Sequence, residues 1–176
     1  IVSDIGELKK AKRVILPGVG AYDTAMKKIN SLTGLKETLD EKVLNEKIPI
    51  LGICLGMQLL TIKSQEGNLN GLGWINGITV KFKEEQNYKI PHMGWNEPQS
   101  FSKNNVLFRD ASLNQKYYFV HSYCVKVANL KDSIMKVNYS ETFDAAINKD
   151  NIFGVQFHPE KSHKYGMKIF QNFSKV

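Results

Sequence analysis

Apolar residues in the first third of the chain alternate between two spacings. Short continuous runs of aliphatic residues are typical of buried strands, and between them apolar residues recur every three or four positions, as in amphipathic helices. In chain order we expect a strand at 13–16, a helix at 24–30 capped by Asp23 and Thr24, a helix at 35–44, a strand at 50–54 and a helix at 55–63. This order indicates a parallel sheet covered by helices.

The pattern changes after Gly67, where glycines interrupt short apolar runs. In chain order we expect strands and turns at 71–90, a polar loop at 96–116, strands at 117–125 and 133–137, a hairpin at 143–157 and a helix at about 161–173 with Met167, Phe170 and Phe173 on one face. The predicted fold is an open, mostly parallel α/β sheet flanked by helices, with a smaller antiparallel portion.

Length and composition describe one globular domain. The chain has 176 residues, of which 42% are hydrophobic and 23% charged. It has no apolar run near the ~20 residues of a membrane span. Two cysteines are too few for a disulfide framework or a zinc site, so we expect reduced thiols, a cytoplasmic protein and no metal. We also expect that residues 1–176 lack an N-terminal βαβ unit of about 30 residues, since little sequence precedes the first strand.

The charge balance is strongly positive. Lysine and arginine number 24 against 17 acidic residues, a net charge of +7. The only arginines are Arg13 and Arg109, and the lysines are spread along the chain. Because arginine is the better reader of phosphates and bases, this pattern indicates a solvated basic surface and no nucleic-acid partner.

The sharpest motif is PILGICLGMQ at 49–58. Gly52 and Gly56 flank Cys54 between a strand and a helix, as in the strained turn that presents a nucleophile in G-x-S-x-G proteins. The following helix would favour a thiolate, and the N–H of Leu55 could donate to an oxyanion. The alternative is a small buried cysteine in a core strand.

A histidine follows another apolar strand, in GVQFHPEKS. His158 could act as the base for Cys54, and Glu160 could hold its imidazole ring as the third member of a triad. His92 and His121 are more typical of structural residues, and His163 of a surface helix. The glycine turn at 17–20 also follows a strand and would meet Cys54 and His158 at the carboxyl edge of the sheet.

Five segments together resemble a known family. They are LPGVGAY (16–22), GICLGMQ (52–58), PHMGWN (91–96), FVHSY (119–123) and GVQFHPEKS (154–162). They are similar to the triad-type glutamine amidotransferases, which have a flavodoxin-like fold, and most of all to the glutaminase subunits of imidazole glycerol phosphate synthase. The resemblance extends from Ser3 to Phe173.

The resemblance implies a glutaminase that needs no cofactor. Cys54 would attack the side-chain amide of glutamine, His158 would carry the proton and Glu160 would orient His158. The residues implied to bind glutamine are Gly18, Gly20, Gln58, Glu66, Ser122 and Tyr123. The oxyanion would be bound by the N–H of Leu55 and a peptide of the Val19-Gly20 turn.

The resemblance also implies a protein partner. We expect PHMGWN to form a short loop. In the family this loop faces a (β/α)₈-barrel cyclase subunit in a heterodimer, so Pro91, Met93 and Trp95 would lie at that interface, which suits aromatic and methionine side chains. The cyclase would use the ammonia to make imidazole glycerol phosphate and aminoimidazole carboxamide ribotide in histidine biosynthesis.

Three other interpretations remain open. A paralogous glutaminase could supply ammonia to a sugar-nucleotide amidotransferase for surface glycans. A second alternative is a catalytically silent module that binds a partner. The third is a stand-alone cysteine hydrolase, which would have no use for the exposed aromatic residues of PHMGWN.

Overall fold

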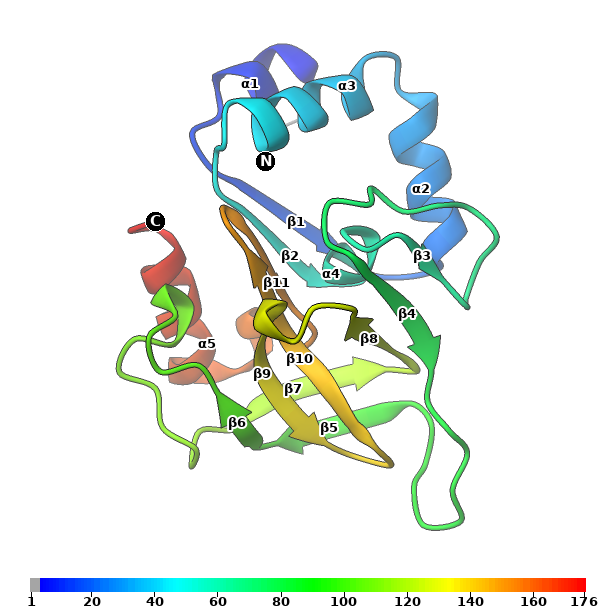
Figure 1. Ribbon diagram of the computed structural model, residues 1–176, viewed down its shortest axis with the longest axis vertical. Coiled ribbons are helices and arrows are strands. Elements are labelled where there is room, and N and C mark those ends of the chain that lie inside the picture. Colours follow the sequence, from blue (N-terminus) through cyan, green and yellow to red (C-terminus); the bar gives the residue numbers. More distant parts are fainter. Residues whose placement is uncertain (1–3) are drawn as a thin grey trace.

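The computed structural model describes residues 4–176 (Figure 1). The helices are α1 Ile5–Lys10, α2 Tyr22–Ser31, α3 Leu35–Asp40, α4 Leu55–Leu59 and α5 His163–Phe173, with a π-helical turn at Glu41–Asn45. The strands are β1 Val14–Gly18, β2 Ile50–Cys54, β3 Lys63–Ser64, β4 Gly77–Lys81, β5 His92–Asn96, β6 Pro98–Phe101, β7 Tyr117–His121, β8 Tyr123–Val127, β9 Ser133–Asn138, β10 Thr142–Lys149 and β11 Ile152–Val155. Short 3₁₀ helices cover Val106–Phe108, Leu130–Asp132 and Pro159–Lys161.

The strands form one large mixed sheet and one small antiparallel sheet. The main order is β1-β2-β11-β10-β8-β4-β3, with β9 joining β10 to β6, and the small sheet pairs β5 with β7. Pairing is parallel for β1 with β2, β2 with β11 and β3 with β4. Helices α1, α2 and α3 lie together at one end of the molecule, and α5 lies apart from them (Figure 1). The predicted α/β class is confirmed.

The centre of the sheet is buried on both faces, which explains its continuous apolar runs. Every residue of β2 and β11 is buried. Ile50 packs in the core beside α1, α2 and α3, whereas its neighbour Leu51 packs in the second core beside α5. Alternating side chains of one strand therefore attach helices to both faces of the sheet.

Several predicted boundaries are wrong. The helix expected at 55–63 ends at Leu59, and the strand expected at 117–125 is two strands in different sheets, separated at Ser122. The segment 96–116 contains β6 as well as loops. Met167 is 52% exposed, so it does not share the buried face of α5 with Phe173.

The predicted cap of α2 is also wrong. Ala21 occupies the N-cap, and no side chain caps the helix. The carboxylate of Asp23 instead accepts hydrogen bonds from the backbone N–H groups of Asn68 and Leu69, at 3.0–3.1 Å. These N–H groups lower the pKa of Asp23. Asp23 therefore holds a distant loop against α2 rather than starting the helix.

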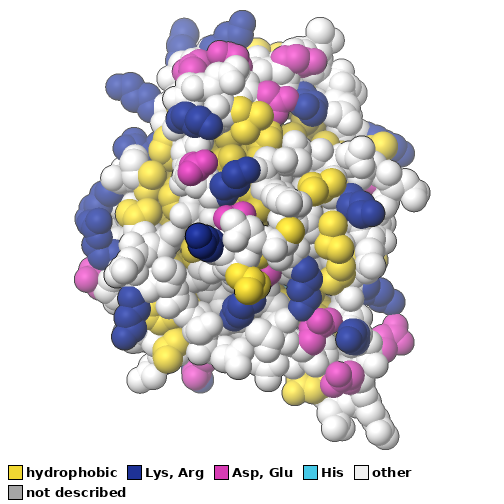
Figure 2. All heavy atoms as spheres, in the orientation of Figure 1, with side chains coloured by type: hydrophobic (Ala, Val, Ile, Leu, Met, Phe, Trp, Pro, Cys, Tyr) yellow, Lys and Arg dark blue, Asp and Glu magenta, His cyan; other side chains and the backbone are white. Residues whose placement is uncertain are grey.

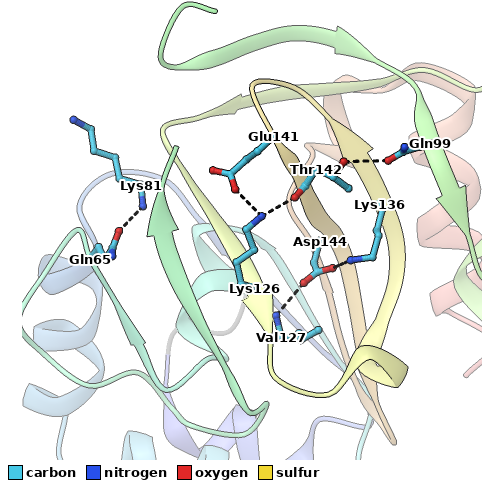
Figure 3. Close-up of polar contacts among 9 residues, drawn as sticks. All are labelled: Gln65, Lys81, Gln99, Lys126, Val127, Lys136, Glu141, Thr142 and Asp144. Carbon is cyan, nitrogen blue, oxygen red and sulfur yellow. Dashed lines mark hydrogen bonds and ion pairs between the residues drawn. The ribbon is translucent and has the colours of Figure 1, made fainter. Parts of the chain in front are cut away.

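A buried carboxylate joins three strands of the larger sheet (Figure 3). Asp144 on β10 accepts hydrogen bonds from the N–H of Val127 on β8 at 2.9 Å and from Lys136 on β9 at 2.7 Å. Ser133 donates to the same carboxylate at 2.6 Å. A buried carboxylate is costly unless it is hydrogen-bonded, so these three donors favour the observed pairing of β10 with β8 and β9.

Charges are scattered over the surface. Figure 2 shows lysine and arginine side chains spread across the visible face, with acidic side chains between them. Across residues 4–176, every helix is too short or too polar to cross a lipid bilayer. The same residues include no group of three His, Cys, Asp or Glu side chains that could hold a metal ion.

Candidate active site

Cys54 occupies a strained turn between β2 and α4. Its φ of 53° and ψ of −110° are unfavourable for a residue with a side chain. The turn passes close to β1, because a Cβ added to Gly56 would lie 1.8 Å from the backbone oxygen of Leu16. A Cβ on Gly52 would lie 2.7 Å from the backbone oxygen of Gly56. The two flanking glycines are therefore required by the geometry that the motif predicted.

Three adjacent parallel strands end at the same edge of the sheet. Gly18 at the end of β1 pairs with Cys54 at the end of β2, and Val155 at the end of β11 pairs with Ile53. His158 follows β11 by three residues. The glycine turn, the cysteine and the histidine thus meet at the carboxyl edge, where ligands bind in open α/β sheets.

A cavity of about 370 Å³ lies at this edge. Its lining residues are Val19, Gly20, Cys54, Leu55, Gln58, Glu66, Pro91, Val120, His121, Ser122, Tyr123 and His158. Most of them are residues that the sequence pointed to, brought together from six separate segments of the chain. Val120 was not predicted, and His121 was interpreted as structural although it reaches the cavity.

His158 is held from several sides. Its Nδ1 lies 2.6 Å from Oε1 of Glu160, whose side chain is 49% exposed and outside the cavity lining. Its backbone N–H donates to Tyr118, and its carbonyl accepts from the Ser162 hydroxyl. The other ring nitrogen, Nε2, is buried and has no hydrogen-bond partner among the residues that the structure describes. Nε2 is thus available to accept a proton.

The surroundings of Cys54 favour the neutral form of its thiol. Burial raises the pKa of its thiol to about 11. The N–H of Leu55 and the amide of Gln156, whose Nε2 lies 3.6 Å from Sγ, lower the pKa by less. The expectation that the helix start favours a thiolate is therefore outweighed by desolvation.

Two buried amides lie behind the sulfur. Nε2 of Gln58 donates to the carbonyl of Tyr123 and to Oε1 of Gln156, both at 3.1 Å. Gln156 was missed by the sequence analysis. The signal that could have found it is a glutamine inside the otherwise apolar run before His158.

The segment that carries Glu66 is braced on both sides. On one side, Asp23 accepts hydrogen bonds from the backbone of Asn68 and Leu69, which follow Glu66. On the other side, Oε1 of Gln65 accepts a hydrogen bond from the N–H of Lys81 at 2.8 Å (Figure 3). Burial raises the pKa of Glu66, which lines the cavity. The carboxylate is thus presented at the cavity by a fixed loop.

The glycine turn is open on its outer side. Val19 is 83% exposed, and Gly20 has a φ of +95° with free space around it. Gly18 does not line the cavity; a Cβ there would lie 2.9 Å from the backbone N of Gly56. Gly18 therefore allows β1 to approach the turn of Cys54, while Val19 and Gly20 face the cavity.

The PHMGWN segment, expected as a loop, is strand β5. It pairs antiparallel with β7, with His92 opposite His121. Met93 is 61% exposed and Trp95 is 46% exposed, whereas His92 is buried. Trp95 stacks on His163, an exposed residue at the start of α5, with ring centroids 5.3 Å apart. The strand therefore has an apolar outer face and a polar inner face. It begins next to the cavity, because Pro91, the residue before it, is part of the cavity lining.

Comparisons with known proteins agree with this geometry. The family of class-I glutamine amidotransferases matches residues 2–176. The chain is 52% identical to imidazole glycerol phosphate synthase subunit HisH 2 of Methanococcus maripaludis over 175 residues, 99% of this chain and 86% of that protein. It is 45% identical to subunit HisH of Methanocaldococcus jannaschii, over 98% of this chain and 85% of the other.

Solved structures share the fold at low sequence identity. The glutaminase domain of a Trypanosoma brucei CTPS superposes with a TM-score of 0.64 at 16% identity, covering 97% of this chain and 74% of that one. A glutamine amidotransferase from Thermotoga maritima superposes with a TM-score of 0.60 at 19% identity, covering 96% and 64%. At this identity the likeness concerns the fold alone.

Proposed function

The chain belongs to the class-I glutamine amidotransferase family, and from this premise we propose that it hydrolyses glutamine to glutamate and ammonia and passes the ammonia to a cyclase. The cyclase makes imidazole glycerol phosphate and aminoimidazole carboxamide ribotide in histidine biosynthesis. One observation supports this most directly: Cys54 and His158 line one cavity, and Glu160 lies 2.6 Å from the far nitrogen of His158.

The proposed reaction begins with the thiol of Cys54. Its sulfur attacks the side-chain amide carbon of glutamine while the thiol proton passes to Nε2 of His158. His158 then gives this proton to the departing nitrogen, the C–N bond breaks, and ammonia leaves a γ-glutamyl thioester. A water molecule, deprotonated by Nε2, attacks the thioester, and glutamate leaves as the thiol forms again. Both acid–base steps use side chains, so the reaction needs no cofactor.

Glu160 is the proposed orienting residue. A carboxylate that accepts from Nδ1 keeps the proton on that nitrogen and leaves Nε2 as the base. It also stabilises the imidazolium that forms when His158 takes the thiol proton.

The rest of the cavity suits a small zwitterion. Glu66 is the proposed partner of the α-ammonium of glutamine, and Gly20, Gln58, Ser122 and Tyr123 form the remaining proposed binding set in the cavity lining. Gly18, which was expected in this set, lies outside the lining and acts by letting β1 approach the turn of Cys54. The oxyanion would accept hydrogen bonds from the N–H of Leu55 and from a peptide of the Val19-Gly20 turn.

The proposed partner is a (β/α)₈-barrel cyclase that forms a heterodimer with this chain. Pro91, Met93 and Trp95 supply the apolar contact, beside the cavity that releases ammonia. A direct passage is chemically useful because free ammonia is mostly protonated, and therefore unreactive, at neutral pH. We treat residues 1–176 as one glutaminase domain that acts in the cytoplasm, where Cys54 stays reduced.

Glutamate release from glutamine tests the proposal. The chain is assayed alone and with the cyclase and its nucleotide ligand, as wild type, Cys54→Ala and Cys124→Ala. Cys124 is the second free, buried thiol and lies outside the cavity lining, which makes it a matched control. We expect release that requires both the cyclase and Cys54 and that persists in Cys124→Ala.

Two results would contradict the proposal. Release that survives in Cys54→Ala would exclude the nucleophile. No release with the cyclase, but release with a sugar-nucleotide amidotransferase, would assign the ammonia to that acceptor instead.

A further inference from the structure

Two buried histidines outside the proposed triad contact each other. Nδ1 of His92 on β5 lies 3.0 Å from Nε2 of His121 on β7. His92 stacks between the rings of Phe119 and Tyr139, at centroid distances of 4.7 and 4.0 Å. Burial lowers the pKa of His92 to about 4 and that of His121 to about 3, so both rings are neutral near pH 7. The proposed reaction uses neither of them.

A backbone carbonyl fixes the direction of the hydrogen bonds between them. The carbonyl of Tyr123 can only accept, so Nδ1 of His121, 2.8 Å away, must carry the proton. Nε2 of His121 is then an acceptor, and Nδ1 of His92 must donate to it. Nε2 of His92 accepts in turn from the amide of Asn96 at 3.2 Å. Asn96 is oriented for this because its Oδ1 accepts from the N–H of Glu97.

The same carbonyl directs a second series of bonds toward the nucleophile. Gln58 must turn its Nε2 toward Tyr123, and this nitrogen also donates to Oε1 of Gln156. Gln156 therefore points its own Nε2 at Sγ of Cys54. Oε1 of Gln58 makes no hydrogen bond within residues 4–176, which leaves an acceptor at the cavity. One carbonyl thus sets the orientation of both amides.

We propose that His92 and His121 are positioning residues for Cys54: they hold the carbonyl of Tyr123, and through it the amides of Gln58 and Gln156, so that the reacting sulfur receives a hydrogen-bond donor. The proposal rests on the proposed glutaminase function. If His92 and His121 only filled space in the core, aromatic rings without nitrogen atoms could take their places. The observed pair instead connects the inner face of β5 to the sulfur through two series of hydrogen bonds that meet at the carbonyl of Tyr123.

His92→Phe tests this with little change in shape. Phenylalanine preserves stacking on Phe119 and Tyr139 but removes both ring nitrogens. We expect Cys54 to react with iodoacetamide about tenfold more slowly at pH 8, because the hydrogen bond from Gln156 to its sulfur is weakened. With the cyclase present, kcat for glutamine hydrolysis should fall by a similar factor, whereas KM should change much less. His92→Gln has a donor and an acceptor, and should recover most of the loss.

The controls separate positioning from stability. Asn172→Leu removes a buried amide that donates to the carbonyls of Leu107 and Arg109, and none of these three residues lines the cavity. It should lower the melting temperature without slowing alkylation. Cys54→Ala reports any labelling of Cys124. If His92→Phe does not fold, Gln156→Leu interrupts the series beside the sulfur and should slow alkylation equally.

Nitrogen NMR reads the hydrogen-bond direction without any reaction. The chain has four histidines, so ¹⁵N-histidine spectra can be assigned from single variants. We expect His92 and His121 as neutral rings protonated at Nδ1 from pH 6 to 8. Protonation of His121 at Nε2 would overturn the proposal, as would folded His92→Phe that reacts and turns over like wild type. If His92→Phe slows alkylation but wild type releases no glutamate with any partner, the network stands and the glutaminase function fails.

Discussion

Removing the carboxylate of Glu160 should slow glutamine hydrolysis without weakening glutamine binding. We consider two variants, Glu160→Gln and Glu160→Ala. The glutamine side chain can still accept a hydrogen bond from Nδ1 of His158 and so preserves the tautomer, but it has no charge. Alanine loses both the charge and the hydrogen bond. Because Glu160 does not line the cavity, KM should change little in either variant.

The size of the effect follows from the geometry. A hydrogen bond to a charged group contributes about 1.5–3 kcal/mol, and the contact of 2.6 Å is short. The side chain of Glu160 is 49% exposed, so solvent screening favours the lower end of that range. About 1.5 kcal/mol corresponds to roughly a tenfold lower kcat for Glu160→Gln. A further neutral hydrogen bond of about 1 kcal/mol brings Glu160→Ala to roughly fiftyfold.

The assay is glutamate release over a range of glutamine concentrations, with the cyclase present. Glu46→Ala is the matched control, because Glu46 is also about half exposed, at 47%, and paired, with Lys42. It should not change kcat. The reasoning is refuted if Glu160→Ala retains kcat within threefold of wild type, or if the main change is in KM.

Three further predictions concern strain, acid stability and the partner surface. Cys54→Gly should have a melting temperature about 2–4 °C above that of Cys54→Ala in calorimetry, because glycine removes backbone strain of about 1 kcal/mol at a φ of 53°. Equal melting temperatures would show that the backbone of Cys54 is not strained. The pKa values of His92 and His121 are lowered in the folded chain and return to about 6.5 on unfolding, so the unfolded chain binds more protons below pH 6.5. The free energy of unfolding, measured with urea, should therefore fall as the pH drops below 6.5, and it should fall less steeply in His92→Phe. A free energy of unfolding that rises as the pH drops would contradict neutral rings. Trp95→Ala should weaken cyclase binding about thirtyfold in titration calorimetry while Cys54 alkylation in the free chain stays the same, and an unchanged Kd would place the interface elsewhere.

The elements with a regular period could be predicted from the sequence. The buried runs of β2 and β11 and the hairpin of β10 with β11 fall where expected. Helix α4 ends early for a non-local reason. The carbonyls of Leu59 and Thr61, which would continue the helix, accept hydrogen bonds from Leu72 and Gly73. A local pattern cannot report this competition.

Strand β5 was missed because its pattern is inverted. Its apolar residues, Met93 and Trp95, face outward, and its polar residues, His92 and Asn96, face inward toward hydrogen-bond partners. The usual rule reads apolar residues as the buried face, so the alternation gave no strand. The inversion itself is informative, because the face of β5 that is exposed to solvent has the large apolar side chains that are common in protein interfaces.

The candidate site divides in a similar way. Cys54, His158 and Glu160 were predictable because each lies in a local motif whose geometry requires its neighbours, such as Gly56. Gln156 and His121 were not, since Gln156 meets Gln58 and Cys54, and His121 meets His92, only through the packing of distant segments. Gln156 does stand out as a polar side chain in an apolar run, but the sequence does not show which group that side chain contacts.

The raised pKa of Cys54 places a condition on the proposed reaction. Because burial raises the pKa of this thiol to about 11, the neutral thiol is favoured near pH 7, and the proposed nucleophile has to be formed during the reaction. The proton must reach His158 as the sulfur bonds to carbon, and the groups that favour this are the donors to sulfur, Leu55 and Gln156. Gln156 is connected through hydrogen bonds to β5, whose outer face has Met93 and Trp95. The proposed positioning network therefore links a donor to the reacting sulfur with the strand whose outer face is the proposed partner surface.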